Sequence, residues 1–347
     1  MIPDNRTLAP IFFSPWNKIM PAYDLPLDEL QKYLPEREEP ADFDSFWEDT
    51  LKDSQAYPIN AMYKPIDFCL ATLDTYDVTF AGWDGQSVKG WLILPKIAPR
   101  PLPCIVEFPS YGGGRGFPLD WLLFASAGYA NFIMDNRGQG SGWRQGDTPD
   151  LFQQGYSPHS PGVMTLGITS PKTYFYRRLF VDAVRAVLTI AKNPRIDPDR
   201  IAVTGMSQGG AVSLAVGALV PTVCAVLPDV PFLSHFRRAT MLVDTPPYNE
   251  INNYCQIHRD QVEQVFRTLS YFDSVNFAVR GRAPALFSVG LMDVIAPPST
   301  VFAAYNWYAG RKDIKIWHFN GHEGGGTYHQ IEKLKFLKKI FALETRN

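Results

Sequence analysis

Residues 201–214 read IAVTGMSQGGAVSL, two apolar runs joined by a short polar corner with glycines on both sides. The corner GMSQG at 205–209 fits the pattern G-x-S-x-G, in which a serine occupies a sharp, strained turn between a strand and a helix. A tight turn without chemistry is the alternative interpretation, but the flanking strand and helix patterns are both well formed. We therefore expect Ser207 to be a nucleophile at the amino end of a helix, where backbone N–H groups favour negative charge.

Short apolar runs recur along the rest of the chain, and helix-like stretches lie between most of them. The apolar runs are at 104–108, 130–135, 201–205, 224–230, 285–290 and 314–319, and the main helix-like stretches are at 175–193, 211–220 and 299–310. Buried strands that alternate with amphipathic helices are typical of a mostly parallel sheet covered on both faces. The sequence thus predicts an α/β fold of this kind.

Residues 1–347 are expected to form a single domain with two additions. The first 75 residues hold two short helical patterns and predict an amino-terminal helical extension, and the segment 231–282 predicts a helical insertion near the active site. Between the extension and the sheet, residues 76–95 are predicted to form a hairpin with its turn at Asp84-Gly85. A second long segment, 139–172, is rich in Gly, Pro and Ser.

A serine nucleophile needs a general base, and the base needs an orienting acid. In this sheet architecture the chain order is Ser, then Asp or Glu, then His, each in a loop after a strand. His322 follows the last predicted strand in a glycine-flanked loop, and Asp293 follows the strand ending at Gly290. The other histidines precede the serine or lie in the insertion, a strand or the last helix: His159, His235, His258, His318 and His329.

The negative charge that develops on the substrate oxygen also needs donors. The backbone N–H of Gln208, directly after the nucleophile, is one expected donor. The second is expected from the loop PSYGGG after the strand at 104–108, where Tyr111 is placed to offer its N–H. Gln208 and Tyr111 are therefore the predicted oxyanion hole. Asp293 has an alternative reading as a helix cap near Pro297.

Composition and motif spacing argue against several other classes of function. The net charge is −2, from 33 Lys and Arg against 35 Asp and Glu, so a nucleic-acid partner is not expected. Neither a bilayer span nor a secretory start is visible, and the four scattered cysteines favour free thiols; a cytoplasmic protein is expected. The stretch HEGGGTYH has the wrong histidine spacing for zinc, and no dinucleotide loop is found, so neither metal nor cofactor is expected.

Three motifs and several longer stretches carry a resemblance to a known family. The motifs are RGQ at 137–139, GMSQG at 205–209 and His322-Glu323, and the stretches include YFYRRLFVDAVRA, PFLSHFRRA and ALFSVGLMDVIAPPSTVFAAYNWYAG. With these, the chain resembles carbohydrate esterase family seven, the acetyl xylan esterases and cephalosporin C deacetylases, and most of all those of thermophilic bacteria. The likeness runs from the first helical pattern to the end of the chain. It departs from many relatives at Pro109-Ser110, where they carry His-Gly, and at Met206, where they carry Gly.

The resemblance implies an α/β-hydrolase fold and assigns roles to individual residues. Ser207 would be the nucleophile, Asp293 the acid and His322 the base, with the amides of Tyr111 and Gln208 as oxyanion hole. Pro247 would line the acyl pocket, with Tyr111 as the other substrate-binding residue, while the RGQ motif would tie loops together.

The resemblance also implies partners. The substrates would be small acetylated sugars or antibiotic esters such as acetylated xylo-oligosaccharides and cephalosporin C, and the assembly a homohexamer, a trimer of dimers.

Three alternatives remain open from the sequence. A peptidase of the prolyl oligopeptidase type uses the same triad on a similar sheet, but only about 75 residues precede the hairpin here, too few for its propeller domain. An acyltransferase uses an identical site. A non-catalytic binding protein on an inactivated hydrolase fold is disfavoured because all of the predicted catalytic positions are occupied by competent residues.

Overall fold

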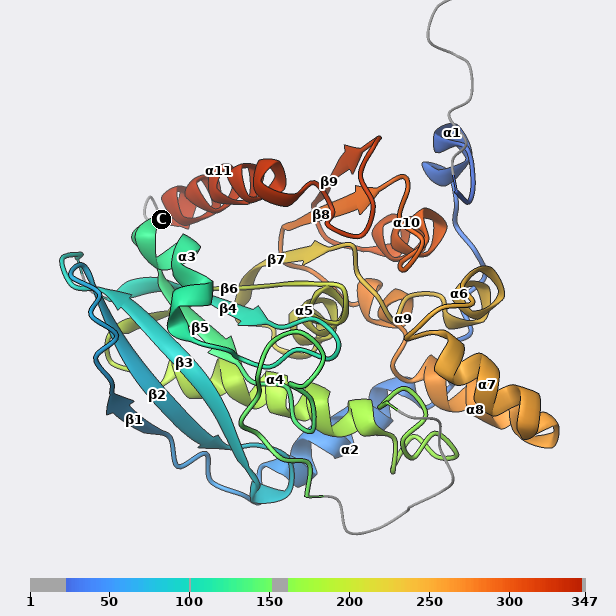
Figure 1. Ribbon diagram of the computed structural model, residues 1–347, viewed down its shortest axis with the longest axis horizontal. Coiled ribbons are helices and arrows are strands. Elements are labelled where there is room, and N and C mark those ends of the chain that lie inside the picture. Colours follow the sequence, from blue (N-terminus) through green and yellow to red (C-terminus); the bar gives the residue numbers. More distant parts are fainter. Residues whose placement is uncertain (1–22, 100, 152–161, 345–347) are drawn as a thin grey trace, which may run out of the picture.

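The computed structural model describes residues 23–99, 101–151 and 162–344, and its centre is one nine-stranded sheet in the order β1-β2-β3-β5-β4-β6-β7-β8-β9 (Figure 1). The strands are β1 (Met62–Pro65), β2 (Leu73–Ala81), β3 (Ser87–Pro95), β4 (Leu102–Phe108), β5 (Ala130–Met134), β6 (Ile196–Met206), β7 (Val223–Asp229), β8 (Ala285–Gly290) and β9 (Lys312–Trp317). The pairs from β5 to β9 are parallel, and those from β1 to β5 are antiparallel. The predicted α/β architecture is confirmed.

Helices cover both faces of this sheet. They are α1 (Leu27–Leu30), α2 (Phe43–Ser54), α3 (Leu122–Ser126), α4 (Phe175–Ala191), α5 (Gln208–Leu219), α6 (Phe236–Leu242), α7 (Asn249–Ile257), α8 (Val262–Ser270), α9 (Ser274–Ala278), α10 (Pro298–Trp307) and α11 (Gly326–Glu344), with short 3₁₀ turns η1 (Trp83–Gly85), η2 (Pro118–Trp121) and η3 (Arg259–Gln261). α3 and α11 lie on one face, and α4, α5 and α10 on the other (Figure 1).

Strand β4 is a continuous apolar run in the sequence because both of its faces are buried. Successive side chains of a strand point to opposite faces, and here both faces are covered. Ile105 packs with Phe124 of α3 and Leu337 of α11, whereas Cys104 and Val106 belong to the core on the opposite face. A polar residue would be buried on either side, so the strand contains almost none.

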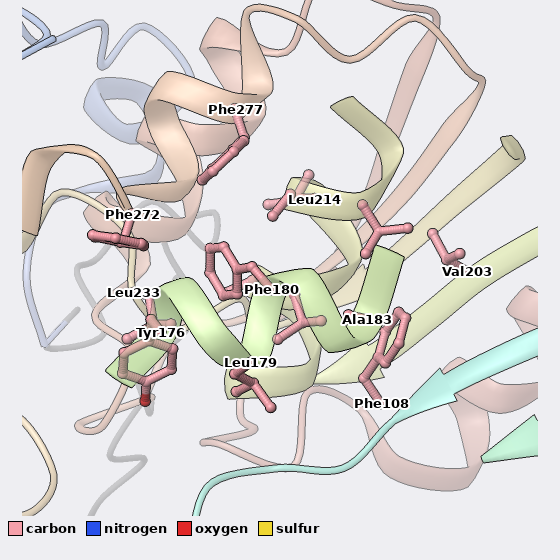
Figure 2. Close-up of a cluster of buried hydrophobic side chains, with 14 of the residues drawn as sticks. Phe108, Tyr176, Leu179, Phe180, Ala183, Val203, Leu214, Leu233, Phe272 and Phe277 are labelled. Carbon is pink, nitrogen blue, oxygen red and sulfur yellow. The ribbon is translucent and has the colours of Figure 1, made fainter. Parts of the chain in front are cut away.

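Helix α4 forms the centre of the larger core, which Figure 2 shows in close-up. The ring of Phe180 lies 6.0 Å from that of Phe272 and 5.6 Å from that of Phe277, measured between centroids. Phe272 and Phe277 belong to the segment 231–282, which contains α6 to α9. Burying an aromatic side chain contributes about 1.5–3 kcal/mol, so these contacts fix that segment against the helix that covers the sheet.

The amino-terminal part differs from the expected helical extension. Besides α1 and α2 it contributes β1, which pairs with β2 at one edge of the sheet, while residues 1–22 lie outside the described part. The stretch Met62–Pro65 is mostly exposed and lacks the apolar pattern of a buried strand, which explains why the sequence did not indicate it. The hairpin at 76–95 is confirmed as β2 and β3, with Asp84 and Gly85 at positive φ in the turn.

The parallel strands bring their carboxyl ends to one edge of the sheet. The loops that follow β4, β6, β7, β8 and β9 therefore lie next to each other although they span more than two hundred residues of sequence. None of the helices in the described ranges has both the length and the hydropathy needed to span a bilayer. Cys69 is exposed, Cys104 is buried, Cys224 and Cys255 are half-buried, and none of these four described cysteines forms a disulfide.

Candidate active site

Ser207 stands on a strained turn between β6 and α5. Its φ of 59° and ψ of −119° are uncommon for a residue with a side chain, and α5 begins at the next residue. The glycines around it allow this close turn: a Cβ on Gly209 would lie 1.9 Å from the carbonyl oxygen of Phe108, and one on Gly205 would lie 2.6 Å from it. The predicted strand–turn–helix geometry is therefore present.

The backbone of Ser207 is anchored on the neighbouring strand, and its side chain lines a cavity. Its N–H donates to the carbonyl oxygen of Asp229 at the end of β7 (2.9 Å), and only 4% of the residue is exposed. The cavity has a volume of about 780 Å³ and is also lined by Tyr111, Pro247 and His322. Four of the residues predicted from the sequence thus meet in one space.

His322 and Asp293 form a hydrogen-bonded pair in which the carboxylate is fully buried. The Nδ1 atom of His322 lies 2.8 Å from Oδ2 of Asp293. The other oxygen, Oδ1, accepts the N–H groups of Ile295 (2.8 Å) and Ala296 (2.9 Å), so Asp293 also caps the turn that precedes α10. The helix α10 itself begins after Pro297, so the cap reading holds for the preceding turn rather than for the helix. The role of Asp293 as the orienting acid stays a prediction, which its contact with His322 supports. Since Nδ1 is engaged, Nε2 is the ring nitrogen left for a proton from the cavity.

Glu323 stabilises the loop that carries His322. Its carboxylate accepts the side-chain amide of Asn320 (2.6 Å) and the N–H of Gly321 (3.0 Å). The hydrogen bond from Asn320 is the main reason that the pKa of Glu323 lies below its usual value. The motif His322-Glu323 therefore pairs one residue in the cavity with a second that shapes the loop.

A second buried Asp–His pair lies beside the nucleophile, and the sequence reasoning missed it. Asp229 accepts from His329 Nε2 (2.8 Å) and from Lys333 Nζ (2.7 Å), and both partners belong to α11. Burial by itself would raise the pKa of Asp229, but Lys333 and His329 outweigh it and lower that pKa. A sequence signal for Asp229 did exist: it lies at the end of a strand, just as Asp293 comes shortly after another strand. His329, 1% exposed, does not line the cavity.

The amides of Tyr111 and Gln208 are the predicted oxyanion donors. Tyr111 follows β4 by three residues, and Gln208 is the first residue of α5, whose amino end carries partial positive charge. Within the described residues, no atom accepts a hydrogen bond from either amide. Tyr111 lines the cavity, and the role of the two amides as donors to a negative oxygen stays a prediction.

Gln139 of the RGQ motif connects these two positions. Its Oε1 accepts the N–H of Gly112 (2.7 Å), and its Nε2 donates to Oε1 of Gln208 (3.1 Å). Arg137 lies elsewhere in the interior, bonded to Asp182 and Asp150. The motif ties loops together, as expected, and one of its ties joins the two predicted donor segments.

The side chain of Tyr111 is held by an acid that the sequence did not single out. Its hydroxyl donates to Glu250 of α7 (2.6 Å) and accepts the N–H of Val163 (2.9 Å), while Met164 N–H donates to the other oxygen of Glu250 (3.0 Å). Burial raises the pKa of Glu250, although the hydrogen bonds that it accepts act in the opposite direction. Burial is also the main reason that the pKa of Tyr111 is raised. Glu250 thus fixes the loop of the predicted oxyanion hole against α7.

Pro247 lies in the cavity wall with Pro246 and Ile295, and these three side chains offer no hydrogen-bonding group.

The two departures from the family pattern, at Pro109-Ser110 and at Met206, also line this cavity. Met206 lines the cavity, and the Ser110 hydroxyl donates to the carbonyl oxygen of Met206 (2.8 Å), which joins the Tyr111 loop to the elbow. His159, which the sequence argument set aside because it precedes Ser207, lies outside the described residues. In the part of the chain that is described, no group of three potential metal ligands occurs.

Comparison with known proteins agrees with this geometry. The acetyl xylan esterase family model matches residues 20–340. A solved acetyl xylan esterase from Paenibacillus sp. R4 is 39% identical, with a TM-score of 0.86 over 91% of this chain and 100% of that one. Acetyl xylan esterase 1 from Thermoanaerobacterium sp. JW/SL YS485 is 33% identical, with a TM-score of 0.83 over 91% of this chain and 99% of that one.

A curated relative and a more distant structure extend the comparison. The acetyl esterase Axe7A of Xylanibacter ruminicola is 26% identical over 320 residues, 88% of this chain and 69% of that protein. An acylaminoacyl peptidase from Pyrococcus horikoshii shares only the fold, at 17% identity and a TM-score of 0.56 over 79% of this chain and 42% of that one. The match over nearly the whole chain, together with the geometry around Ser207, shows that this chain belongs to the acetyl xylan esterase family.

Proposed function

We propose that the chain is a serine esterase that removes acetyl groups from small acetylated substrates such as xylo-oligosaccharides through an acetyl-serine intermediate. The observation that carries the proposal is the cavity itself. Ser207 and His322 line the same space, and the ring of His322 is held from behind by the buried Asp293. Membership of the acetyl xylan esterase family supports the acetyl group as the acyl part.

In the first step, Ser207 Oγ attacks the acetyl carbonyl carbon while His322 Nε2 takes the hydroxyl proton. The carbonyl electron pair moves onto the oxygen, which binds the amides of Tyr111 and Gln208. The tetrahedral intermediate collapses, its C–O bond to the alcohol breaks, and His322 returns the proton to the departing oxygen. Asp293 keeps the imidazole oriented and stabilises its protonated form.

In the second step, water takes the place of the alcohol. His322 removes a proton from the water as its oxygen attacks the acetyl-serine carbonyl, and collapse of the second intermediate returns the proton to Ser207 Oγ. Acetate leaves, and neither an oxidant nor a cofactor enters the balance.

The acyl group is proposed to lie against Pro246, Pro247 and Ile295. This wall is apolar, which suits a methyl group. We propose a short acyl group because the chain belongs to the acetyl xylan esterase family. We expect p-nitrophenyl acetate to be cleaved faster than the octanoate ester, and Ser207→Ala to abolish cleavage. Comparable turnover of the octanoate would contradict the short-acyl part, and an active Ser207→Ala would contradict the nucleophile.

Finer aspects of the function are proposed on resemblance. We propose cephalosporin C as an accepted acetyl ester, tested by acetate release beside acetylated xylobiose. We also propose a homohexamer, which fits the apolar side chains around the edge strand β9: Phe319 is 71% and Tyr328 75% exposed. Sedimentation at six times the mass of one chain is the expected result, and a monomer would contradict it. The cytoplasmic location stays a prediction.

A further inference from the structure

The cavity lining also includes residues of different chemistry, which no catalytic role described above uses. Besides the apolar Pro246, Pro247 and Ile295, the same cavity is lined by charged and aromatic side chains, and we call this part of the lining its polar end. These are Glu107 at the end of β4, Asp120 and Trp121 of η2, Trp143 and Arg144, and Lys333 of α11 beside Asp229. Arg144 contacts Asp120 and Trp121, so these residues form one group.

Lys333 brings unused hydrogen-bond donors to this end. Only 2% of its side chain is exposed, and Asp229 Oδ2 lies 2.7 Å from its Nζ atom. An ammonium group has three donors, and Asp229 is its only hydrogen-bond acceptor among the described residues. Asp229 itself is occupied, since its other oxygen binds His329. Lys333 lines the cavity, and its Nζ atom also lies 5.7 Å from the centroid of the Phe124 ring, so the N–H groups that Asp229 does not bind have no acceptor among the described residues.

Glu107 brings an unused acceptor. Its Oε2 accepts the side-chain amide of Asn131 at 3.2 Å, and no described residue donates to Oε1. The same Asn131 amide donates to the carbonyl oxygen of Trp121 (3.1 Å), so the acid and the aromatic residue are held by one side chain. Burial raises the pKa of Glu107, although Lys333 nearby opposes that rise. A group so placed gains by accepting a hydrogen bond from a ligand.

Two tryptophans that contact the same arginine also line this part of the cavity. The guanidinium carbon of Arg144 lies 4.3 Å from the ring centroid of Trp121 and 4.8 Å from that of Trp143. Trp143 Nε1 donates to the carbonyl oxygen of Tyr111 (2.8 Å), which fixes the wall to the predicted oxyanion loop. Aromatic rings offer broad apolar area while their polar atoms stay bonded.

The balance of charge selects the kind of ligand. An anion would meet Glu107 and Asp120, and a cation would meet Lys333 and Arg144, so neither suits this end of the cavity. A neutral ring with several hydroxyl groups can donate to Glu107, accept from Lys333 and rest its C–H face on an indole. We propose that Glu107, Lys333 and the two tryptophans form the subsite for the sugar alcohol of the acetyl ester, with Glu107 as its specificity-determining acceptor.

This proposal depends on the proposed esterase function, and the test separates the two. Glu107→Gln keeps the size of the side chain but replaces the free acceptor with a donor. We measure kcat/KM for acetylated xylobiose with free hydroxyls and for p-nitrophenyl acetate, which carries no sugar. The ratio of the two is expected to fall about tenfold or more in the variant, the size of a lost hydrogen bond to a charged group.

The matched control is Glu332→Gln on α11, whose carboxylate pairs with Lys315 and Lys335 outside the cavity. This control is expected to leave the ratio unchanged. A ratio that also stays unchanged in Glu107→Gln would overturn the subsite. Failure of the wild-type protein to cleave p-nitrophenyl acetate would instead overturn the esterase function.

A second measurement uses the wild-type protein and stays decisive if the variant does not fold. Methyl β-xyloside, which has hydroxyls but no acetyl group, is expected to inhibit cleavage of p-nitrophenyl acetate competitively. Mannitol, an open-chain polyol without a ring face, is expected to inhibit at least about fivefold less strongly because the stacking on the indoles is lost. Equal inhibition by both, or none by the xyloside, would contradict a sugar-ring subsite.

Discussion

The strained backbone of Ser207 is held in place by hydrogen bonds and close contacts with its neighbours. Its N–H is bound to Asp229, its carbonyl oxygen accepts the N–H of Phe232 (3.0 Å), and Gly209 lies directly against Phe108. This backbone conformation places Ser207 in the lining of the cavity. A side chain added at Gly209 must therefore move either the elbow or β4.

We predict that Gly209→Ala lowers the free energy of unfolding by about 3 kcal/mol or more, since a Cβ 1.9 Å from a backbone oxygen cannot be relieved by a rotamer change. Urea unfolding measures the effect. Gly321→Ala is the matched control, because its Cβ would lie 3.5 Å from the nearest atom, and it is expected to cost less than about 1 kcal/mol. Equal losses in the two variants would contradict the packing argument.

Two histidines close to Ser207 are each paired with a buried aspartate, and only one of them lines the cavity. His322 presents its free ring nitrogen there, whereas Nδ1 of His329 is buried without a hydrogen-bond partner among the described residues. Chain order alone allows either pair, because Asp229 and His329 also follow Ser207. Access to the cavity distinguishes them.

We predict that His322→Asn lowers kcat for p-nitrophenyl acetate by about 10³-fold or more, as loss of a general base in a triad does. His329→Asn is expected to lower kcat less than about tenfold while lowering Tm, because its contact is structural. Steady-state kinetics with a thermal melt of each variant gives both numbers. The reverse pattern would assign the base to His329.

At the scale of elements, a buried ionic network joins three separate parts of the chain. The side chain of Arg137 is fully buried and binds two aspartates, Asp182 of α4 and Asp150 of the loop between β5 and α4. Arg178 of α4 also binds Asp150. Asp182 in turn accepts the N–H of Trp83 in the hairpin turn (2.7 Å). The network holds the loop after β5 against α4 behind the active-site edge.

We predict that Arg137→Met destabilises the fold by about 3–5 kcal/mol, because it leaves a fully buried carboxylate without its cation. Lys335→Met is the control, since Lys335 is exposed and a surface ion pair of this kind contributes little to stability. Denaturant unfolding of both variants checks the difference. A loss below 1 kcal/mol in Arg137→Met would mean that the network adds little to stability.

At the scale of the whole molecule, stability should depend on pH through Asp273. Its carboxylate accepts the N–H groups of His235, Phe236 and Val275 and so joins the starts of α6 and α9. Burial nevertheless raises its pKa from 3.8 to about 6. Between these values the folded protein binds more protons than the unfolded chain, so stability falls as pH rises through this range.

We predict that the free energy of unfolding of the wild-type protein, relative to Asp273→Asn, falls by up to about 3 kcal/mol between pH 4 and pH 7. The partial solvent contact of Asp273 makes this an upper bound. Urea unfolding of both proteins at several pH values gives the difference, in which the other titrating groups cancel. A difference that is constant with pH, or that grows as pH rises, would contradict the raised pKa.

Local sequence patterns were enough to predict the parallel strands and most of the helices between them, the elbow at Ser207 and the loop positions of His322 and Asp293. Each of these is encoded locally: an apolar run, a glycine on either side of a serine, or a polar residue directly after a strand. Parallel strands then bring their carboxyl ends together, so local patterns were enough to assemble this part of the site. The edge strand β1 was not predicted because it is mostly exposed and so has no apolar pattern.

The partners of buried polar groups, by contrast, depend on how the folded elements pack. Asp229 binds residues a hundred positions away on α11, Glu250 holds Tyr111 across 139 residues, and Glu107 opens onto the same cavity as Ser207. Nothing local marks such pairs, because a lone acid in a sequence has the same pattern whether it is solvated or buried. The partner that stabilises a buried charge is chosen by how the elements pack.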